Sequence, residues 1–277
     1  MSYILTALFG FFAGSLSGFF GIGGGVVFVP TLLFILRADG YATGPAMLIA
    51  TGTSLGAIVL ATSSSAMKHY SMGNIRTETV IPIIIGVVLT SAIGVIITNA
   101  IGGDPLRYLL AAFNIWAAYR LFKQSLSHRK QNGNSSKFLY DSVKKMPLKI
   151  IIFLFGIGVI VGIKSAMLGI GGGVFVVSGL VIFLHYPSKN AAGTSSLVAL
   201  TAALIGVFFR GLFGHPPDTV PPGTIGTINI PLALTLGIPA MFGAQIGARI
   251  HKILKENRWF YITFAILLVM VTIKMIW

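Results

Sequence analysis

The sequence lacks cysteine and contains few charged residues, and both absences restrict what the protein can be. None of its 277 residues is cysteine, only six are Asp or Glu, and twenty are Lys or Arg. Without cysteine the chain has no disulfide, no thiolate metal site and no cysteine nucleophile. Charged residues form 9% of the chain, hydrophobic residues form 55%, and the mean hydropathy is +0.89. This composition excludes a soluble globular domain and predicts a polytopic membrane protein.

Basic residues are absent from the first part of the chain, because the first Lys or Arg is Arg37. The N-terminal segment therefore has no basic n-region of a cleaved signal peptide, and we expect it to be part of the fold. The net charge of +14 comes mostly from loops between apolar runs, so it predicts membrane orientation and no nucleic-acid partner. The five histidines lack metal-ligand spacing and no nucleophile–base pair is identifiable, so we expect no metal, no cofactor and no enzyme activity.

Apolar runs of two kinds divide the chain. Six have the length of one membrane span, which is about 20 residues. Two are too long for one span, and glycine-rich stretches interrupt them: FFGIGGGVVF at 19–28 and MLGIGGGVFV at 167–176. The single spans are predicted at 42–66, 78–100, 106–125, 188–211, 226–250 and 258–276, and the broken segments are 3–36 and 149–186.

The chain repeats itself well beyond these glycines. ATGTSLGA at 50–57 is matched by AAGTSSLVA at 191–199. Gly73 and Gly94 are separated by the same number of residues as Gly226 and Gly247 in a second matching pair of segments. The sequence therefore predicts two homologous transmembrane repeats, 1–125 and 149–277, joined by a basic cytoplasmic linker at 126–148.

Loop charge decides how each broken segment is placed. If each crosses the membrane once, the Lys and Arg residues other than Lys164 divide about 12 to 7 between the two sides. If each is a re-entrant hairpin they divide 15 to 4, which the positive-inside rule favours. Each repeat is then a broken hairpin plus three spans, so the all-α fold has two inverted repeats and both termini outside. The outer group of four consists of Arg37, Arg107, Arg210 and Lys274.

The glycine breaks predict an anion site. A turn at membrane depth leaves N–H groups without partners unless protein, water or a ligand satisfies them, and a helix N-terminus attracts anions. We expect the two breaks to face each other near the midplane, with close helix packing as the alternative explanation of the glycines. The glycines that we expect to bind substrate are Gly21, Gly23, Gly24, Gly25, Gly169, Gly171, Gly172 and Gly173.

Hydroxyl side chains follow each broken segment at matched positions. We expect them to line the substrate site, although hydroxyls in helices also bond back to carbonyls of the preceding turn. Gln245 is a further polar residue within a span and is expected either in the site or in a bond between helices. The predicted hydroxyl ligands are Thr51, Thr53 and Ser54 in the first repeat and Thr194, Ser195 and Ser196 in the second.

Lys164 lies five residues before the second glycine break, where the first repeat has Leu16. A cation at this depth is costly unless it faces water or a partner, and every Asp and Glu falls in a loop or at a span end. We expect Lys164 to face the transported anion, with snorkelling toward the cytoplasmic side as the alternative.

Paired GIGGG segments about 150 residues apart, each followed by a GTS helix, resemble the TauE/SafE family of sulfite and organosulfonate exporters. The resemblance covers nearly the whole chain. It implies transport of small sulfur-containing anions, such as sulfite or organosulfonates, driven by an ion gradient.

We therefore expect a multi-pass protein of the plasma (cytoplasmic, or inner) membrane that moves sulfite, thiosulfate or an organosulfonate by alternating access. A passive anion channel on the same scaffold is the alternative. A membrane enzyme or an assembly protein has no supporting motif. The absence of carboxylates within the spans argues against an Asp/Glu proton relay, so H+ stays one candidate coupling ion, and the oligomeric state is open.

Overall fold

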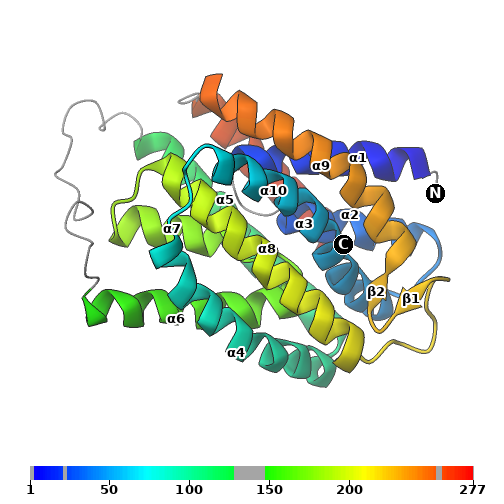
Figure 1. Ribbon diagram of the computed structural model, residues 1–277. Coiled ribbons are helices and arrows are strands. Elements are labelled where there is room, and N and C mark those ends of the chain that lie inside the picture. The colour runs from blue at the N-terminus through cyan, green and yellow to red at the C-terminus, as the bar shows by residue number, and fades with distance from the viewer. Residues whose placement is uncertain (1–2, 21–23, 128–146, 254–257, 277) are drawn as a thin grey trace.

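The computed structural model describes residues 3–20, 24–127, 147–253 and 258–276, so most of the predicted linker lies outside the described residues. The described residues form ten helices and one short hairpin of two strands (Figure 1). The elements are α1 (Tyr3–Phe20), α2 (Gly25–Ala38), α3 (Thr43–Ser71), α4 (Thr77–Ile101), α5 (Gly103–Ser127), α6 (Leu148–Leu168), α7 (Gly173–Phe183), α8 (Ser188–Phe213), β1 (Thr224–Ile225), β2 (Ile228–Asn229), α9 (Ile230–Ile253) and α10 (Arg258–Ile276).

Both glycine-rich stretches interrupt a helix. The helices that follow them, α2 and α7, have 14 and 11 residues, or about 21 and 17 Å, which is less than the roughly 30 Å of a bilayer core. Each begins after a glycine in the left-handed region, Gly24 with φ 74° and Gly172 with φ 70°. Glycine adopts this conformation without the steric cost that a Cβ adds, so the chain can turn there.

Stripes of small residues bring helices from the two halves of the chain into close contact. A Cβ on Gly14 would lie 2.2 Å from the carbonyl oxygen of Ala240, and one on Gly158 would lie 2.2 Å from that of Ile83. Lipid tails are as apolar as side chains, so such close backbone packing is a main source of helix association in membranes. Three residues of α1 face three of α9 in the same chain order, so these helices are parallel: Gly10 with Leu236, Gly14 with Ala240 and Gly18 with Ala244.

The two sets of five helices interlock. The first helix of each set packs against the fourth of the other, as α1 against α9 and α6 against α4. The third helices, α3 and α8, pack together, and so do the fifth helices, α5 and α10. Ser65 contacts Ser196 at 3.2 Å between hydroxyl oxygens, whereas Leu55, ten residues earlier, meets Gly206. Since Gly206 comes ten residues after Ser196, α3 and α8 are antiparallel.

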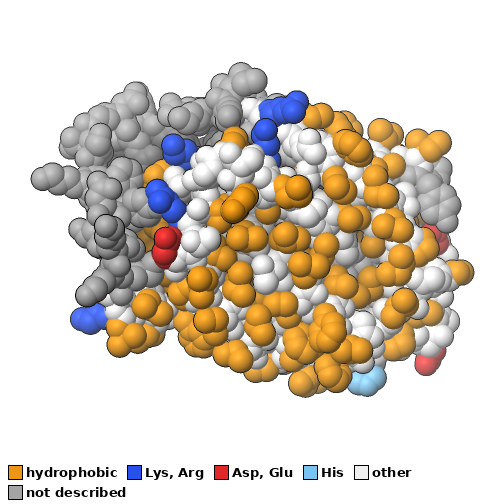
Figure 2. Space-filling model, in the orientation of Figure 1, with side chains coloured by type: hydrophobic (Ala, Val, Ile, Leu, Met, Phe, Trp, Pro, Cys, Tyr) orange, Lys and Arg blue, Asp and Glu red, His pale blue; other side chains and the backbone are white. Residues whose placement is uncertain are grey.

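Much of the surface is apolar. Large hydrophobic side chains are exposed along the outer faces of several helices, among them Leu89 on α4, Ile152 on α6 and Phe208 on α8. Figure 2 shows hydrophobic side chains over most of one face, with the visible Lys and Arg side chains at its left and upper margins. Within the described ranges, five helices are long and apolar enough to cross a membrane. The prediction of an all-α polytopic membrane protein is confirmed.

One predicted span begins later than expected. Residues 226–229 belong to a hairpin in which Thr224 pairs with Asn229, and α9 begins only at Ile230. The hairpin forms because Gly226 has φ 57°, which suits a tight turn, and Asn229 caps the helix by accepting the N–H of Leu232 at 3.0 Å.

Candidate functional site

The two glycine breaks are in direct contact. A Cβ added to Gly25 would lie 2.4 Å from the carbonyl oxygen of Gly169 and 2.4 Å from the Cα of Ile170, so only glycine allows this approach. The structure thus brings together the described glycines of both predicted breaks, all of them buried. Gly21 and Gly23 lie outside the described residues. The described glycines are Gly24, Gly25, Gly169, Gly171, Gly172 and Gly173.

The second break ends at a helix N-terminus with free donors. The carbonyl of Gly172 accepts the N–H groups of Phe175 and Val176 at 3.1 and 3.4 Å. In the part of the chain that the structure describes, the N–H groups of Gly173 and Val174 have no acceptor. Such N–H groups and the positive end of the helix dipole form an anion-binding surface.

The predicted hydroxyl side chains are all buried, and several of them fix the second break. Ser54 on α3 donates to the carbonyl of Gly169 at 2.7 Å, and Ser195 on α8 donates to that of Gly173 at 3.0 Å. Thr53 accepts the N–H of Asn229 at 2.9 Å, and Ser196 donates to Ala192 one turn earlier. Ser54 and Ser195 therefore position the backbone at the break.

Arg210 is a buried cation that the loop-charge count misplaced on the outer side. Its side chain on α8 is fully buried, and Nε and Nη2 donate to the carbonyls of Ala166 and Met167 at 3.0 and 2.8 Å. It also donates to the hydroxyls of Thr51 and Thr227, at 3.1 and 3.3 Å. Ala166 and Met167 lie in the last turn of α6, where carbonyls have no partner within the helix, so Arg210 caps α6 at the break.

None of the partners that Arg210 has among the described residues is a carboxylate. The sequence did contain a signal for this role, because Arg210 stands in the apolar run LVALTAALIGVFFRGLF and not in a polar loop. An arginine within such a run is expected to face the protein interior.

Lys164 is half-buried on α6 and rests against aromatic rings beside the second break. Its Nζ lies 3.7 Å from the ring centroid of Phe175 on α7 and 4.6 Å from that of Phe113 on α5. Phe175 stacks on Trp116 with centroids 4.9 Å apart. A ring face attracts a cation without neutralising it. The described residues offer Lys164 no carboxylate partner, so its charge is available to an anion.

Charge around the breaks is of one sign. The Asp and Glu residues that the structure describes are all exposed, whereas Arg210 is fully buried. Gln245 is exposed on α9, on the side of Ile238 and Phe242, while Ala244 and Gly247 of the same helix face α1. The structure therefore leaves Gln245 apart from the other predicted site residues.

These features define an integral membrane protein of interlocked, glycine-broken helices with a positively charged centre. The family model described as "Sulfite exporter TauE/SafE" matches residues 6–275, and the chain belongs to this family. It is 31% identical over 245 residues to a "Probable membrane transporter protein" of Haemophilus influenzae, covering 88% of this chain and 87% of that one. It is 30% identical over 250 residues to "Probable membrane transporter protein MJ0441" of Methanocaldococcus jannaschii, covering 90% and 86%. No solved structure matches the chain. The protein is a membrane transporter of the TauE/SafE type.

Proposed function

We propose that the protein moves a small sulfur-containing oxyanion, such as sulfite, thiosulfate or an organosulfonate, by alternating access. The substrate binds where the two glycine breaks meet, and the N–H groups at the start of α7 donate to its oxygens. Lys164 supplies positive charge, and Arg210 holds the break in place. The description of the family, which names sulfite export, supports the sulfur oxyanion.

The contact between Gly25 and Gly169 is the observation that carries this proposal. It joins two helix breaks from different halves of the chain at one point, beside a free helix N-terminus and a buried cation. Helix dipoles and buried basic side chains favour an anion over a cation at such a point, since the described Asp and Glu residues are all exposed.

The arrangement of the helices supports inverted repeats and rocking of one half against the other. The equivalent helices α3 and α8 are antiparallel, and the packing of α1 against α9 corresponds to that of α6 against α4 when the halves are exchanged. Helix α1 begins at the right of the view, away from the left and upper margins where the visible Lys and Arg gather (Figures 1 and 2). We propose that the protein lies in the plasma membrane, with both termini outside the cell and the basic linker in the cytoplasm.

Flux of sulfite and thiosulfate into proteoliposomes tests the proposal, with and without an imposed proton gradient. Uptake against the anion's concentration gradient that collapses with a protonophore supports a coupled transporter with H+ as the coupling ion. Flux that only follows the anion gradient indicates a channel. Absence of flux for both anions and for a small organosulfonate rejects the substrate class.

A further inference from the structure

Three buried polar side chains around the second break have no hydrogen-bond partner among the described residues. They are Asn114, through both Nδ2 and Oδ1, Ser165 through Oγ, and Thr194 through Oγ1. All three have an exposed fraction of 0%. A buried polar group without a partner costs as much as a lost hydrogen bond or more, so native structures retain it where something else binds.

Ser165 and Thr194 adjoin the backbone of the break. The carbonyl of Ser165 accepts the N–H of Gly169 at 2.9 Å, at the start of the break. Thr194 directly precedes Ser195, whose hydroxyl holds Gly173 at its end.

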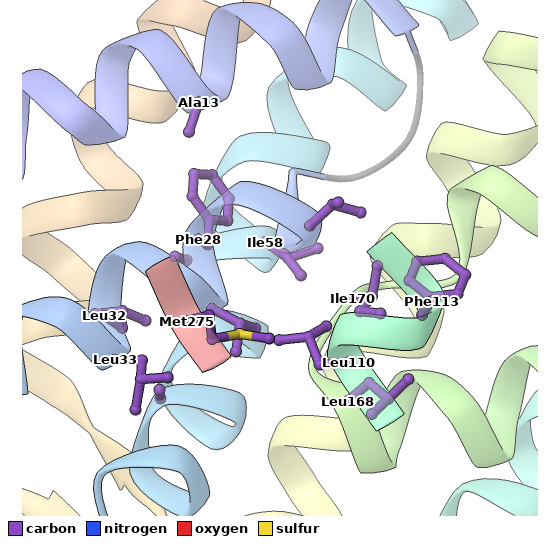
Figure 3. Packing of buried hydrophobic residues seen from close by; sticks show 14 of the residues in the cluster. Ala13, Phe28, Leu32, Leu33, Ile58, Leu110, Phe113, Leu168, Ile170 and Met275 are labelled. Atoms are coloured by element: carbon purple, nitrogen blue, oxygen red, sulfur yellow. The ribbon is translucent and has the colours of Figure 1, made fainter. Parts of the chain in front are cut away.

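Asn114 occupies the middle of the buried face of α5. It follows Phe113, whose ring contacts Lys164. Its neighbours one turn away, Leu110, Ala111, Ala117 and Ala118, belong to the same core as Leu168 and Ile170. Figure 3 shows Leu110 and Phe113 beside those two residues of the break. Asn114 is therefore buried on the face of α5 that contributes to this core, next to the residue that contacts Lys164.

The matching position of the first repeat is satisfied within the protein. Thr53, the counterpart of Thr194 in the GTS motif, accepts the N–H of Asn229. A missing partner is thus not inherent in the motif. Ser165 and Thr194 belong to the second half of the chain, as Lys164 does, and Asn114 comes from α5 of the first half.

We infer that Asn114, Ser165 and Thr194 bind the transported anion, and that Asn114 selects an oxyanion that also carries a hydrogen-bond donor. The two hydroxyls and the Nδ2 group donate to anionic oxygens. Oδ1 only accepts, and a fully deprotonated oxyanion offers it no proton. The substrate is therefore a protonated oxyanion or a sulfonate with a hydroxyl or amino group; its sulfur content rests on the proposed function.

Ligand-induced thermal stabilisation of the purified full-length protein tests this inference. The probes are pairs that differ by one hydroxyl, 2-hydroxyethanesulfonate with ethanesulfonate and glycolate with acetate, together with sulfite across its protonation range. We expect wild type to bind the hydroxylated partner at least about tenfold more tightly, since a site built for a donor rejects the analogue that lacks it.

Asn114→Leu keeps the approximate volume of the side chain and removes both unpartnered atoms. We therefore expect it to raise the unfolding midpoint of the ligand-free protein. We also expect the ratio of affinities for the hydroxylated and unhydroxylated probes to fall from about ten to about one. Ser165→Ala weakens both members of a pair by about tenfold. Ser91→Ala is the matched control, because Ser91 is equally buried but donates to Val87 at 2.7 Å, and it leaves binding unchanged.

The inference is overturned if wild type and Asn114→Leu prefer the hydroxylated probe to the same degree. It is also overturned if Ser165→Ala binds the probes as tightly as Ser91→Ala does, or if wild type binds none of them. A donor preference confined to glycolate and lost in Asn114→Leu upholds the inference and rejects the sulfur substrate. If sulfite binds more tightly once it is protonated, and only in protein that retains Asn114, the substrate is the inorganic anion. If the protein prefers 2-hydroxyethanesulfonate, the substrate is an organosulfonate.

Discussion

Replacing Arg210 by Met tests whether this side chain holds the second break together. The substitution keeps a flexible unbranched stem but removes the guanidinium, and it leaves the carbonyls of Ala166 and Met167 buried without donors, at a cost of about 1–3 kcal/mol each. It also removes a cation from the negative end of α6, which contributes up to about 2 kcal/mol in buried sites. Relief of the buried charge offsets part of this loss. We expect a net loss of about 3 kcal/mol.

Thermal unfolding of the purified protein in detergent measures the effect of Arg210→Met. At about 2–4 °C per kcal/mol for a chain of this size, the midpoint should fall by roughly 6–12 °C. Arg210→Lys should fall in between, because an ammonium keeps the charge but lacks the planar fork that reaches both carbonyls. Arg107→Met, on a partly exposed arginine that contacts Tyr108, is the control and should change little. An Arg210→Met midpoint within 1–2 °C of wild type would refute the capping role.

Two further substitutions test the packing that positions the site. Gly14→Ala places a Cβ 2.2 Å from a backbone oxygen and should lower the unfolding free energy by at least about 2 kcal/mol. The control is Gly156→Ala, which has open space around it and should be neutral or stabilising. Equal unfolding midpoints for the two variants would contradict the packing argument. Phe175→Leu removes the ring under Lys164 and should lower the free energy of unfolding by about 1–2 kcal/mol, measured by thermal unfolding. The control is Phe183→Leu, on an exposed ring of the same helix, which should lower it by less than about 0.5 kcal/mol. The reverse order would count against the aromatic contact.

The sequence predicted the features that depend on composition and chain order. Apolar runs identify the membrane helices because a span requires about 20 apolar residues. The GIGGG stretches identify the breaks because glycine tolerates the conformation at Gly172 and the contact at Gly25. The repeated GTS motif contains the hydroxyls of Ser54 and Ser195, which contact the break, and their predicted role as substrate ligands stays a prediction.

Features that depend on contacts between distant segments could not be predicted in this way. Arg210 meets α6 across 44 residues of sequence, and a count of loop charges cannot separate a capping arginine from a solvated one. Asn114 and Ser165 carry no motif, and their lack of partners is visible only once the neighbouring helices are packed. Gln245 is exposed because the small residues Ala244 and Gly247 direct a different face of α9 toward α1.

The flux of sulfite and thiosulfate through Lys164→Ala, compared with wild type and Lys274→Ala in matched proteoliposomes, tests the central claim most directly. Lys274 is a suitable control because it is also a cation over an aromatic ring, 5.5 Å from Phe34, but is exposed at the end of α10. The account predicts gradient-dependent flux in wild type and Lys274→Ala and at least a tenfold lower rate in folded Lys164→Ala protein. Equal rates in all three proteins would contradict an anion site beside Lys164 at the second glycine break.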